Sequence, residues 1–183
     1  MATEDETRNL ERAESLHDPI IFILTDHDRQ RVIAASLERL ANEPMGSSAR
    51  DAAAYIRGYL LHELPTHIAD EEEDLLPALA RRVLPDDGFE ALKRRIAEEH
   101  EADEAERTRL LALLEAVAQG RAGAGAPAFA EAARRFAAQM RRHLAWENSV
   151  ILELARERLL PEDLAAIAHG MAERRGLLPP HPG

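Results

Sequence analysis

The sequence predicts an all-α protein, from its composition, from the absence of strand patterns and from the order of its helix signals. The chain has 183 residues, of which 45% are hydrophobic and only 4% are aromatic. Its apolar residues are mainly Ala and Leu, which are strong helix formers. We find no run in which β-branched or aromatic residues alternate with polar ones, as a half-buried strand requires. A chain of this length suits one domain with a substantial core.

The first long helix is predicted to begin at Asp18-Pro19, with Asp18 as the N-cap and Pro19 in the first helical position. It runs to about Ala41, where the turn-forming segment NEPMGSS closes it. Residues 1–17 precede this helix as a polar N-terminal lead. The metal-binding bundle itself is predicted to span residues 18–160.

The second helix is predicted to begin near Ser48, whose side chain can cap it. Pro65 lies inside this helix and should kink or locally loosen it, because proline removes one backbone donor. Pro77 either ends the helix or begins a short continuation to about Leu84.

Two further long helices complete the predicted bundle. The turn PDDG begins the third helix, which reaches about Gln119, and the glycine-rich segment GRAGAGAP links it to the fourth. The fourth helix spans about Ala128 to Leu159. Pro161 begins a shorter fifth helix, so that residues 161–183 form a C-terminal helix and tail. Four long helices with short connections predict an antiparallel up-down-up-down four-helix bundle with a short extra C-terminal helix.

The charge and the residue usage argue against several classes of function. The formal net charge is −11 and the pI is about 5.2, so the chain repels phosphate backbones and anionic membranes. We therefore expect no nucleic acid and no membrane as partner. No stretch of about 18 apolar residues occurs, and the N-terminal sequence is acidic, which argues against a membrane span and a secretory signal and predicts a cytoplasmic protein. The chain has no cysteine, which excludes disulfides, thiolate zinc sites, iron–sulfur clusters and thiol nucleophiles.

Six residues with metal-binding side chains are distributed over the four long helices. Two pairs have the spacing H-x-x-x-E, which places both side chains on one face of a helix, and two single histidines lie on the other two helices. Apolar residues surround each of them, so these side chains should point into the core, where an unpaired imidazole or carboxylate is costly. A metal ion would remove that cost. The six candidate ligands are His27, His67, Glu71, His100, His143 and Glu147.

The candidate ligands also lie at similar depths along the predicted helices. With a rise of about 1.5 Å per residue, His27 lies roughly 12 Å from the start of its helix, and His67 with Glu71 lies roughly 8–14 Å from the same end of the bundle. His100 lies roughly 18 Å from that end, and the pair on the fourth helix roughly 17–24 Å. Since predicted helix ends are accurate only to a few residues, the six side chains can meet in one layer.

The number and the kind of these ligands favour two metal ions. Four ligands fill a structural zinc site, so six are too many for one such site. Four imidazoles and two carboxylates suit iron or manganese better than calcium or magnesium. If Glu71 and Glu147 each bridge the two ions, with an oxo or hydroxo bridge between them, one octahedral position on each ion stays open for a small ligand.

The same segments resemble the haemerythrin-like family, in its HHE cation-binding branch. They are TDHDRQ around His27, LPTHIADEEEDLLP around His67 and Glu71, AEEHEADE around His100, and RRHLAWENSVILELA around His143 and Glu147. The most specific piece is H-x-x-x-E-E followed by an apolar pair and Pro. The resemblance implies a four-helix bundle with a non-haem di-iron centre that binds dioxygen, nitric oxide or peroxide. We expect two iron ions as the cofactor, with manganese or zinc as alternative metals.

The chain departs from the oxygen-carrying haemerythrins at two positions. Those proteins have H-x-x-x-H on the third helix, where this chain has His100 and Glu104, and an aspartate near the fourth-helix histidine, where it has Glu147. With four His and two Glu, the sequence is more similar to the branch implicated in sensing, iron handling and repair of damaged iron centres.

Three functions are consistent with these residues. We favour a di-iron protein that binds or senses oxygen, nitric oxide or iron, with a small diatomic molecule or peroxide as its partner. The alternative is a di-iron enzyme that acts on nitric oxide or peroxide, or that donates iron for repair of iron centres. A metal-free helical interaction module is the third hypothesis.

Several residues near the candidate ligands permit two interpretations. Glu104 is an additional ligand or, as we favour, a solvated charge. Tyr59 and Glu63 precede His67 at four-residue steps and so lie on the same face of the helix. They either support the site or take part in ordinary packing. Trp146 is expected to pack in the core or in an interface. The acidic run Asp70–Asp74, apart from the candidate ligand Glu71, is expected to form a solvated face.

Overall fold

The computed structural model describes residues 17–42 and 46–177, and over these residues the chain is helical, with no strand. The all-α prediction is therefore confirmed. The predicted polar lead, apart from His17, and most of the predicted tail lie outside the described residues. No helix in the described ranges is long and apolar enough to cross a membrane.

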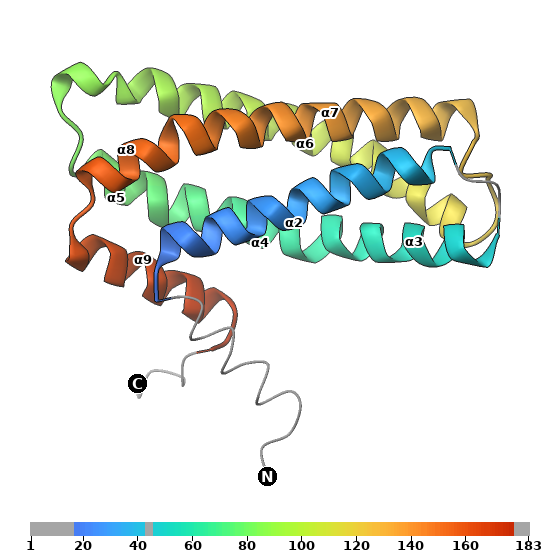
Figure 1. Ribbon diagram of the computed structural model, residues 1–183, viewed down its shortest axis with the longest axis horizontal. Coiled ribbons are helices and arrows are strands. Elements are labelled where there is room, and N and C mark those ends of the chain that lie inside the picture. Colours follow the sequence, from blue (N-terminus) through green and yellow to red (C-terminus); the bar gives the residue numbers. More distant parts are fainter. Residues whose placement is uncertain (1–16, 43–45, 178–183) are drawn as a thin grey trace, which may run out of the picture.

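The helical segments follow the predicted order and form a bundle of long rods (Figure 1). Segments η1 and η2 are π-helical and η3 is a 3-10 helix. The segments are α2 (Pro19–Leu40), α3 (Ser47–Gly58), η1 (Tyr59–Glu63), α4 (Leu64–Ala69), η2 (Asp70–Leu75), α5 (Leu76–Ala80), η3 (Pro85–Asp87), α6 (Phe89–Ala118), α7 (Pro127–Ser149), α8 (Ile151–Arg158) and α9 (Pro161–Arg174).

The two predicted N-caps have different outcomes. The Asp18 carboxylate accepts hydrogen bonds from the backbone N–H groups of Ile20 and Ile21, at 3.0 and 3.1 Å, and so caps α2 as predicted. The predicted cap at Ser48 is wrong. Gly46, in an extended conformation, occupies the N-cap position of α3, and Ser48 already lies inside the helix.

Segments α3 to α5 form one continuous rod that is locally widened before each of its two prolines. The N–H of Leu64 donates to the carbonyl of Tyr59, five residues earlier, and Pro65 follows directly. Because Pro65 has no N–H, the next carbonyl in this register, that of Leu60, lacks a partner within the helix. The Arg107 guanidinium on α6 donates to it at 2.7 Å. The loosening predicted at Pro65 is therefore a π-helical turn, and a second one, η2, precedes Pro77.

The predicted fourth helix is divided at Val150 into α7 and α8. The backbone of Val150, with φ −122° and ψ −61°, leaves the helical region. The preceding Ser149 hydroxyl donates back to the carbonyl of Ala145 at 2.9 Å, a contact that often bends helices. The N–H of Leu154 still donates to the carbonyl of Val150, so α8 continues α7 as one bent rod.

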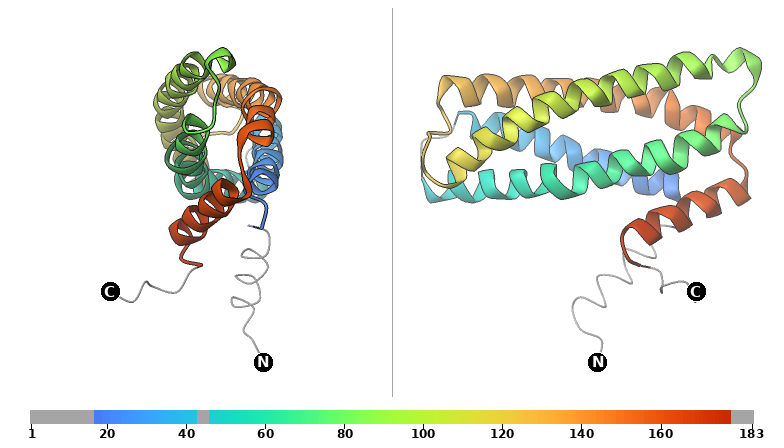
Figure 2. Two further views of the ribbon diagram at one scale, coloured as in Figure 1. Left: turned by 90° about the vertical axis from the view of Figure 1, so that its left-hand side faces the viewer. Right: turned by 180° about the vertical axis from the view of Figure 1, so that it is seen from behind.

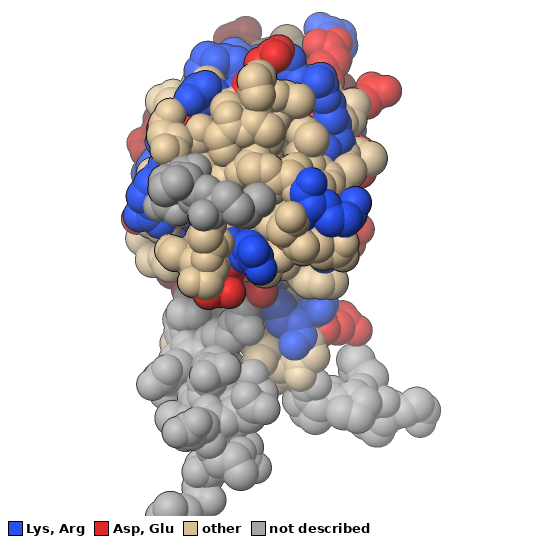
Figure 3. Space-filling model, turned by 90° about the vertical axis from the view of Figure 1, so that its right-hand side faces the viewer, with Lys and Arg blue, Asp and Glu red and all other residues tan. Residues whose placement is uncertain are grey.

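The rods pack in pairs, α2 against α7 and α3 against α6, and α6 also contacts α7. Viewed along the bundle, these rods surround a common axis and α9 lies outside them (Figure 2). The end of the bundle that carries the connections α2–α3 and α6–α7 is mostly uncharged at its centre, with Lys and Arg near its edge (Figure 3).

The buried side chains form two apolar clusters with a polar layer between them. The linker-side cluster is built around Ile33, Leu37, Ile56, Leu60, Leu110, Leu114, Phe129 and Phe136. The α9-side cluster is built around Ile20, Ile23, Leu75, Leu79, Phe89, Ile96, Leu152 and Met171. Along α2 the second cluster ends at Ile23 and the first begins at Ile33, with buried His27 and Gln30 between them. The rods formed by α3 to α5 and by α6 show the same sequence of apolar, polar and apolar positions.

Candidate metal centre

All six predicted ligands lie in the polar layer and form two groups of four that share both glutamates. One group contains His27 and His67, the other contains His100 and His143, and Glu71 and Glu147 belong to both. Within each group, one potential ligand atom from every residue lies within 4.8 Å of the others, and all six residues are buried. The residues come from four rods, which explains why the H-x-x-x-E pairs alone could not complete a site.

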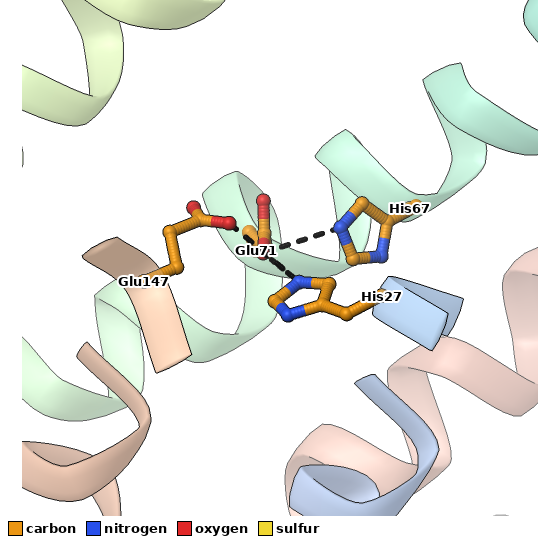
Figure 4. A group of neighbouring side chains, drawn as sticks. All are labelled: His27, His67, Glu71 and Glu147. Carbon is orange, nitrogen blue, oxygen red and sulfur yellow. Dashed lines mark ion pairs between the residues drawn. The ribbon is translucent and has the colours of Figure 1, made fainter. Parts of the chain in front are cut away.

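The two oxygens of Glu71 face different groups. Its Oε1 atom lies 3.5 Å from His27 Nε2 and 3.3 Å from His67 Nε2 (Figure 4). Its Oε2 atom lies 3.5 Å from His100 Nε2. Glu147 also reaches both groups, because its Oε2 atom lies 3.5 Å from His27 Nε2 and 3.2 Å from the Nε2 of His143. This arrangement is the one expected of two bridging carboxylates.

Several of these atoms are buried without a hydrogen bond. Buried polar atoms are normally paired, because an unpaired one loses its contacts with water and gains nothing in return. The unpaired atoms face one small volume and are imidazole nitrogens and carboxylate oxygens, which are the donors that transition metals bind. The residues therefore fit a pair of cations. The atoms are His27 Nε2, His100 Nε2, Glu71 Oε2 and Glu147 Oε2.

Without metal, protons must balance the charges of this layer. Burial works against the charged form of Glu71, but attraction from His67 and the other nearby histidines lowers its pKa well below the usual range. Burial and the negative charge of Glu71 raise the pKa of Glu147 well above the usual range. Burial disfavours the imidazolium form of His100, but contacts with Glu71 and Glu72 outweigh it and raise the pKa of His100 to about 9. Cations at these positions would replace the protons.

Each candidate histidine also directs its Nδ1 atom at an oxygen on a different rod. Such contacts fix the tautomer, so that Nε2 is left to face the ligand layer. Three of the four are hydrogen bonds and the fourth is too long to be one. They join His27 to Asn148 Oδ1 at 2.5 Å, His100 to Glu72 Oε1 at 2.7 Å, His143 to Glu99 Oε2 at 2.7 Å, and His67 to Asp26 Oδ2 at 3.9 Å.

The sequence interpretation missed these four supporting residues, although each stands directly beside a candidate ligand in the chain. Asp26 precedes His27 and Glu72 follows Glu71, but each supports a histidine on another rod. A neighbouring residue in a helix points about 100° away around the axis, so spacing within one helix cannot reveal such a contact. The usable signal is a polar residue next to each ligand.

The residues with two interpretations lie outside both groups. Tyr59 is buried in the linker-side cluster, where burial raises the pKa of its hydroxyl above the usual value. Glu63 is half exposed and lies 3.6 Å from Arg29. Glu104 is exposed and ion-paired with Arg107, in agreement with the favoured interpretation as a solvated charge.

Trp146 is half-buried against the α9-side cluster, and the Arg95 guanidinium lies 4.0 Å from the centre of its ring. The expected solvated face at Asp70–Asp74 is wrong for its first residue. Asp70 is fully buried, and Arg174 and Arg175 lie 2.6 and 2.5 Å from its carboxylate. The end of α9 packs on this part of η2, and its last residue, Arg174, and the following Arg175 supply the two guanidinium groups.

A cavity of about 20 Å³ adjoins the layer on its linker side. Its wall includes His67, His100 and His143, and the buried side chain of Gln30, whose amide nitrogen has no hydrogen-bond partner. Asp103 also lines it, accepts a hydrogen bond from Gln139, and has a pKa raised by burial. This cavity holds about one water-sized molecule.

A helical bundle with a buried layer of His and Glu side chains, two of them shared between two groups, defines a metal-binding bundle protein. The sequence model of the Hemerythrin HHE cation binding domain matches residues 18–155, and the chain belongs to this family. No curated protein sequence matches the chain.

Proposed function

We propose that this protein binds two iron ions in an antiparallel up-down-up-down bundle of the haemerythrin-like type, and uses them to bind or sense a small ligand such as dioxygen or nitric oxide. The observation that carries this proposal is the sharing of Glu71 and Glu147 by two groups of histidines. His27 and His67 would hold one ion, and His100 and His143 the other. An iron pair supplies reversible electron exchange and an exchangeable coordination position.

The cavity beside the layer supports a ligand of one or two non-hydrogen atoms. Its volume of about 20 Å³ is too small for an organic substrate. Leu64, Phe136 and Met140 form the apolar part of its wall, while the Gln30 amide can donate a hydrogen bond to an electronegative atom. The wall also carries polar side chains, among them Asp103 and Arg107, so it favours a polar diatomic molecule over dinitrogen or a hydrocarbon.

Anaerobic loading of the full chain with ferrous iron tests the proposal. We expect two irons per chain and a change in absorption when nitric oxide or oxygen is added. Gln30→Leu should keep both irons and speed the dissociation of the ligand several-fold, because it removes one neutral hydrogen bond worth about 1 kcal/mol. Binding of a single zinc in preference to iron, with no response to either gas, would refute the proposal.

An enzymatic role is the second candidate, and Asp103 is the observation that favours it. Its carboxyl group lines the cavity and is mostly buried, so it can hold a proton beside a reacting molecule. If the protein reduces peroxide or nitric oxide, Asp103→Asn should lower turnover at least tenfold while ligand binding persists. The amide oxygen of Asn can still accept the hydrogen bond from Gln139. Stoichiometric binding without turnover in the wild type would favour the sensing role.

A further inference from the structure

We infer that the two metal positions are unequal, and that the position at His100 and His143 binds its cation first and more tightly than the position at His27 and His67. This inference rests on the proposed function, since it concerns the same pair of metal ions. Two independent features of the structure carry it: the groups that support the histidines and the charges that surround them.

The supporting contacts run around the bundle, from each rod to a histidine on another rod, but they differ in chemistry. Both histidines of one group, His100 and His143, donate to carboxylates at 2.7 Å. In the other group, His27 donates to a neutral amide oxygen. His67 has no hydrogen bond at Nδ1, because the nearest carboxylate oxygen, on Asp26, is 3.9 Å away.

A carboxylate acceptor makes an imidazole a better metal ligand. It draws the Nδ1 proton toward itself, which raises the basicity of Nε2, and such outer contacts change metal affinity by roughly 10- to 100-fold. Hydrogen bonds to an ionised group are about twice as strong as bonds between neutral groups. Two carboxylate-supported imidazoles therefore outweigh one that is supported by an amide and one that has no support.

The charges around the two positions differ in the same direction. Near His27 and His67, arginines already neutralise the carboxylates. Asp26 lies 3.2 Å from Arg29 and 3.8 Å from Arg175, and Asp70 is paired with Arg174, the last residue of α9, and with Arg175, which follows it. The two carboxylates that lie beside these histidines on the neighbouring segments, Asp26 and Asp70, therefore already have cationic partners.

Near His100 and His143, the carboxylates of Glu72 and Glu99 have only one arginine between them. Glu99 lies 2.8 Å from Arg95. Within the part of the chain that the structure describes, Glu72 forms no ion pair with Lys or Arg. A divalent cation at this position therefore gains more electrostatic attraction than one at the other position.

Anaerobic titration of the full metal-free chain with Co²⁺, followed by its visible absorption, measures the two affinities separately. We expect two binding steps whose dissociation constants differ at least tenfold. His143→Ala should remove the tighter step and His27→Ala the weaker one. Two equal steps, or loss of the tighter step in His27→Ala, would overturn the inference and leave the proposed function standing. Failure of the wild-type chain to bind any Co²⁺ or Fe²⁺ would overturn both.

Isosteric variants of the supporting residues test whether these residues cause the difference in affinity between the two metal positions. Glu72→Gln and Glu99→Gln replace a carboxylate by an amide that can still accept the hydrogen bond, and each should weaken the tighter step by 10- to 100-fold. Asn148→Asp should strengthen the weaker step and so reduce the difference between the two dissociation constants. Glu98→Gln is the matched control for Glu99→Gln. It makes the same charge change on an exposed residue of the same helix, α6, and should leave both steps unchanged. Equal weakening of both steps by Glu99→Gln and Glu98→Gln would show a general charge effect and refute the assignment.

Discussion

Glu71 and Glu147 occupy a different position from the four histidines, because each lies within reach of both groups. If they bridge, replacing either with Ala should remove both metal ions, since the remaining ligands would leave excess positive charge in a low-dielectric core. His27→Ala or His100→Ala should weaken chiefly one ion. Metal analysis and melting temperatures of these four variants measure the difference.

His62→Ala and His169→Ala serve as controls, because both side chains are exposed and belong to neither group. Their metal content and melting temperature should match those of the wild type. If Glu71→Ala and Glu147→Ala both keep two irons per chain, the bridging assignment is wrong.

The titration of His100 leads to a prediction about pH. In the metal-free chain its pKa is about 9, above the usual histidine value of 6.5, so its protonated form stabilises the fold fully below pH 6.5. That contribution is lost as the pH rises from 6.5 through 9. The metal-loaded chain should behave in the opposite way, because cations compete with protons and bind more tightly as the pH rises.

Melting temperatures of both forms between pH 6 and pH 9.5 should therefore diverge, with the metal-free form becoming less stable and the loaded form more so. Addition of metal at pH 7 should also release protons into a weakly buffered solution, which an indicator dye can follow. Parallel pH profiles for the two forms, with no proton release, would contradict the assignment of these groups as ligands.

The sequence predicted the six candidate ligands because each lies on an apolar stripe, and because a buried imidazole or carboxylate requires a partner. The structure brings all six together. The sequence alone could not predict the partners of the Nδ1 atoms of these histidines. Glu99, for example, stands beside His100 but supports His143, and this contact depends on how α6 and α7 are rotated against each other.

Among the elements, α9 is attached to the rod formed by α3 to α5 by charge and by close packing. It lies beyond residues 18–155, the region that matches the family. Arg174 and Arg175 pair with buried Asp70, the neighbour of Glu71. Gly170 allows the approach, because a Cβ atom there would lie 2.3 Å from Asp74 Oδ1.

Gly170→Ala should therefore destabilise the protein, against the usual trend for a glycine inside a helix. Ala normally gains about 1 kcal/mol over Gly in such a position. Here its methyl group would displace the Asp74 carboxylate from Arg174 and push α9 away from η2. Calorimetry should show a lower melting temperature, and limited proteolysis should cut near α9 sooner.

Gly58→Ala is the matched control. Gly58 is also helical, and nothing lies within 4 Å of a Cβ atom placed there, so this substitution should raise stability by about 0.5–1 kcal/mol. If Gly170→Ala stabilises the protein as Gly58→Ala does, the packing of α9 on η2 contributes nothing.

The sequence predicted where most of the helices begin and end, since proline, glycine and capping residues act locally. It could not predict the π-helical turn before Pro65. A proline shows only that one N–H is missing, whereas the wider turn also depends on Arg107, which donates to the Leu60 carbonyl from another rod. The docking of α9 is likewise decided by partners about a hundred residues away in the chain, such as Asp70 and Arg174.

At the scale of the whole molecule, the polar layer separates the linker-side cluster from the α9-side cluster, and ligands from four rods meet in it. Two bound cations would tie these rods together across the division. A metal that binds only the folded chain adds its binding free energy to stability, about 2.7 kcal/mol when its free concentration is 100 times its dissociation constant. Without metal, the layer holds buried polar atoms that have no hydrogen bond.

Metal removal should therefore weaken the α9-side cluster more than the linker-side cluster. The α9 side depends on short segments, α5, α8 and α9, and on ion pairs such as that between Arg158 and Asp87. The linker side contains longer helical runs and the buried rings of Phe129 and Phe136. Local opening in a protein is easiest where few buried apolar contacts hold a segment. Amide hydrogen exchange of the metal-free and iron-loaded chains should show the larger loss of protection in α5, α8 and α9, whereas an equal loss in both clusters would show that the metal stabilises the bundle as one unit.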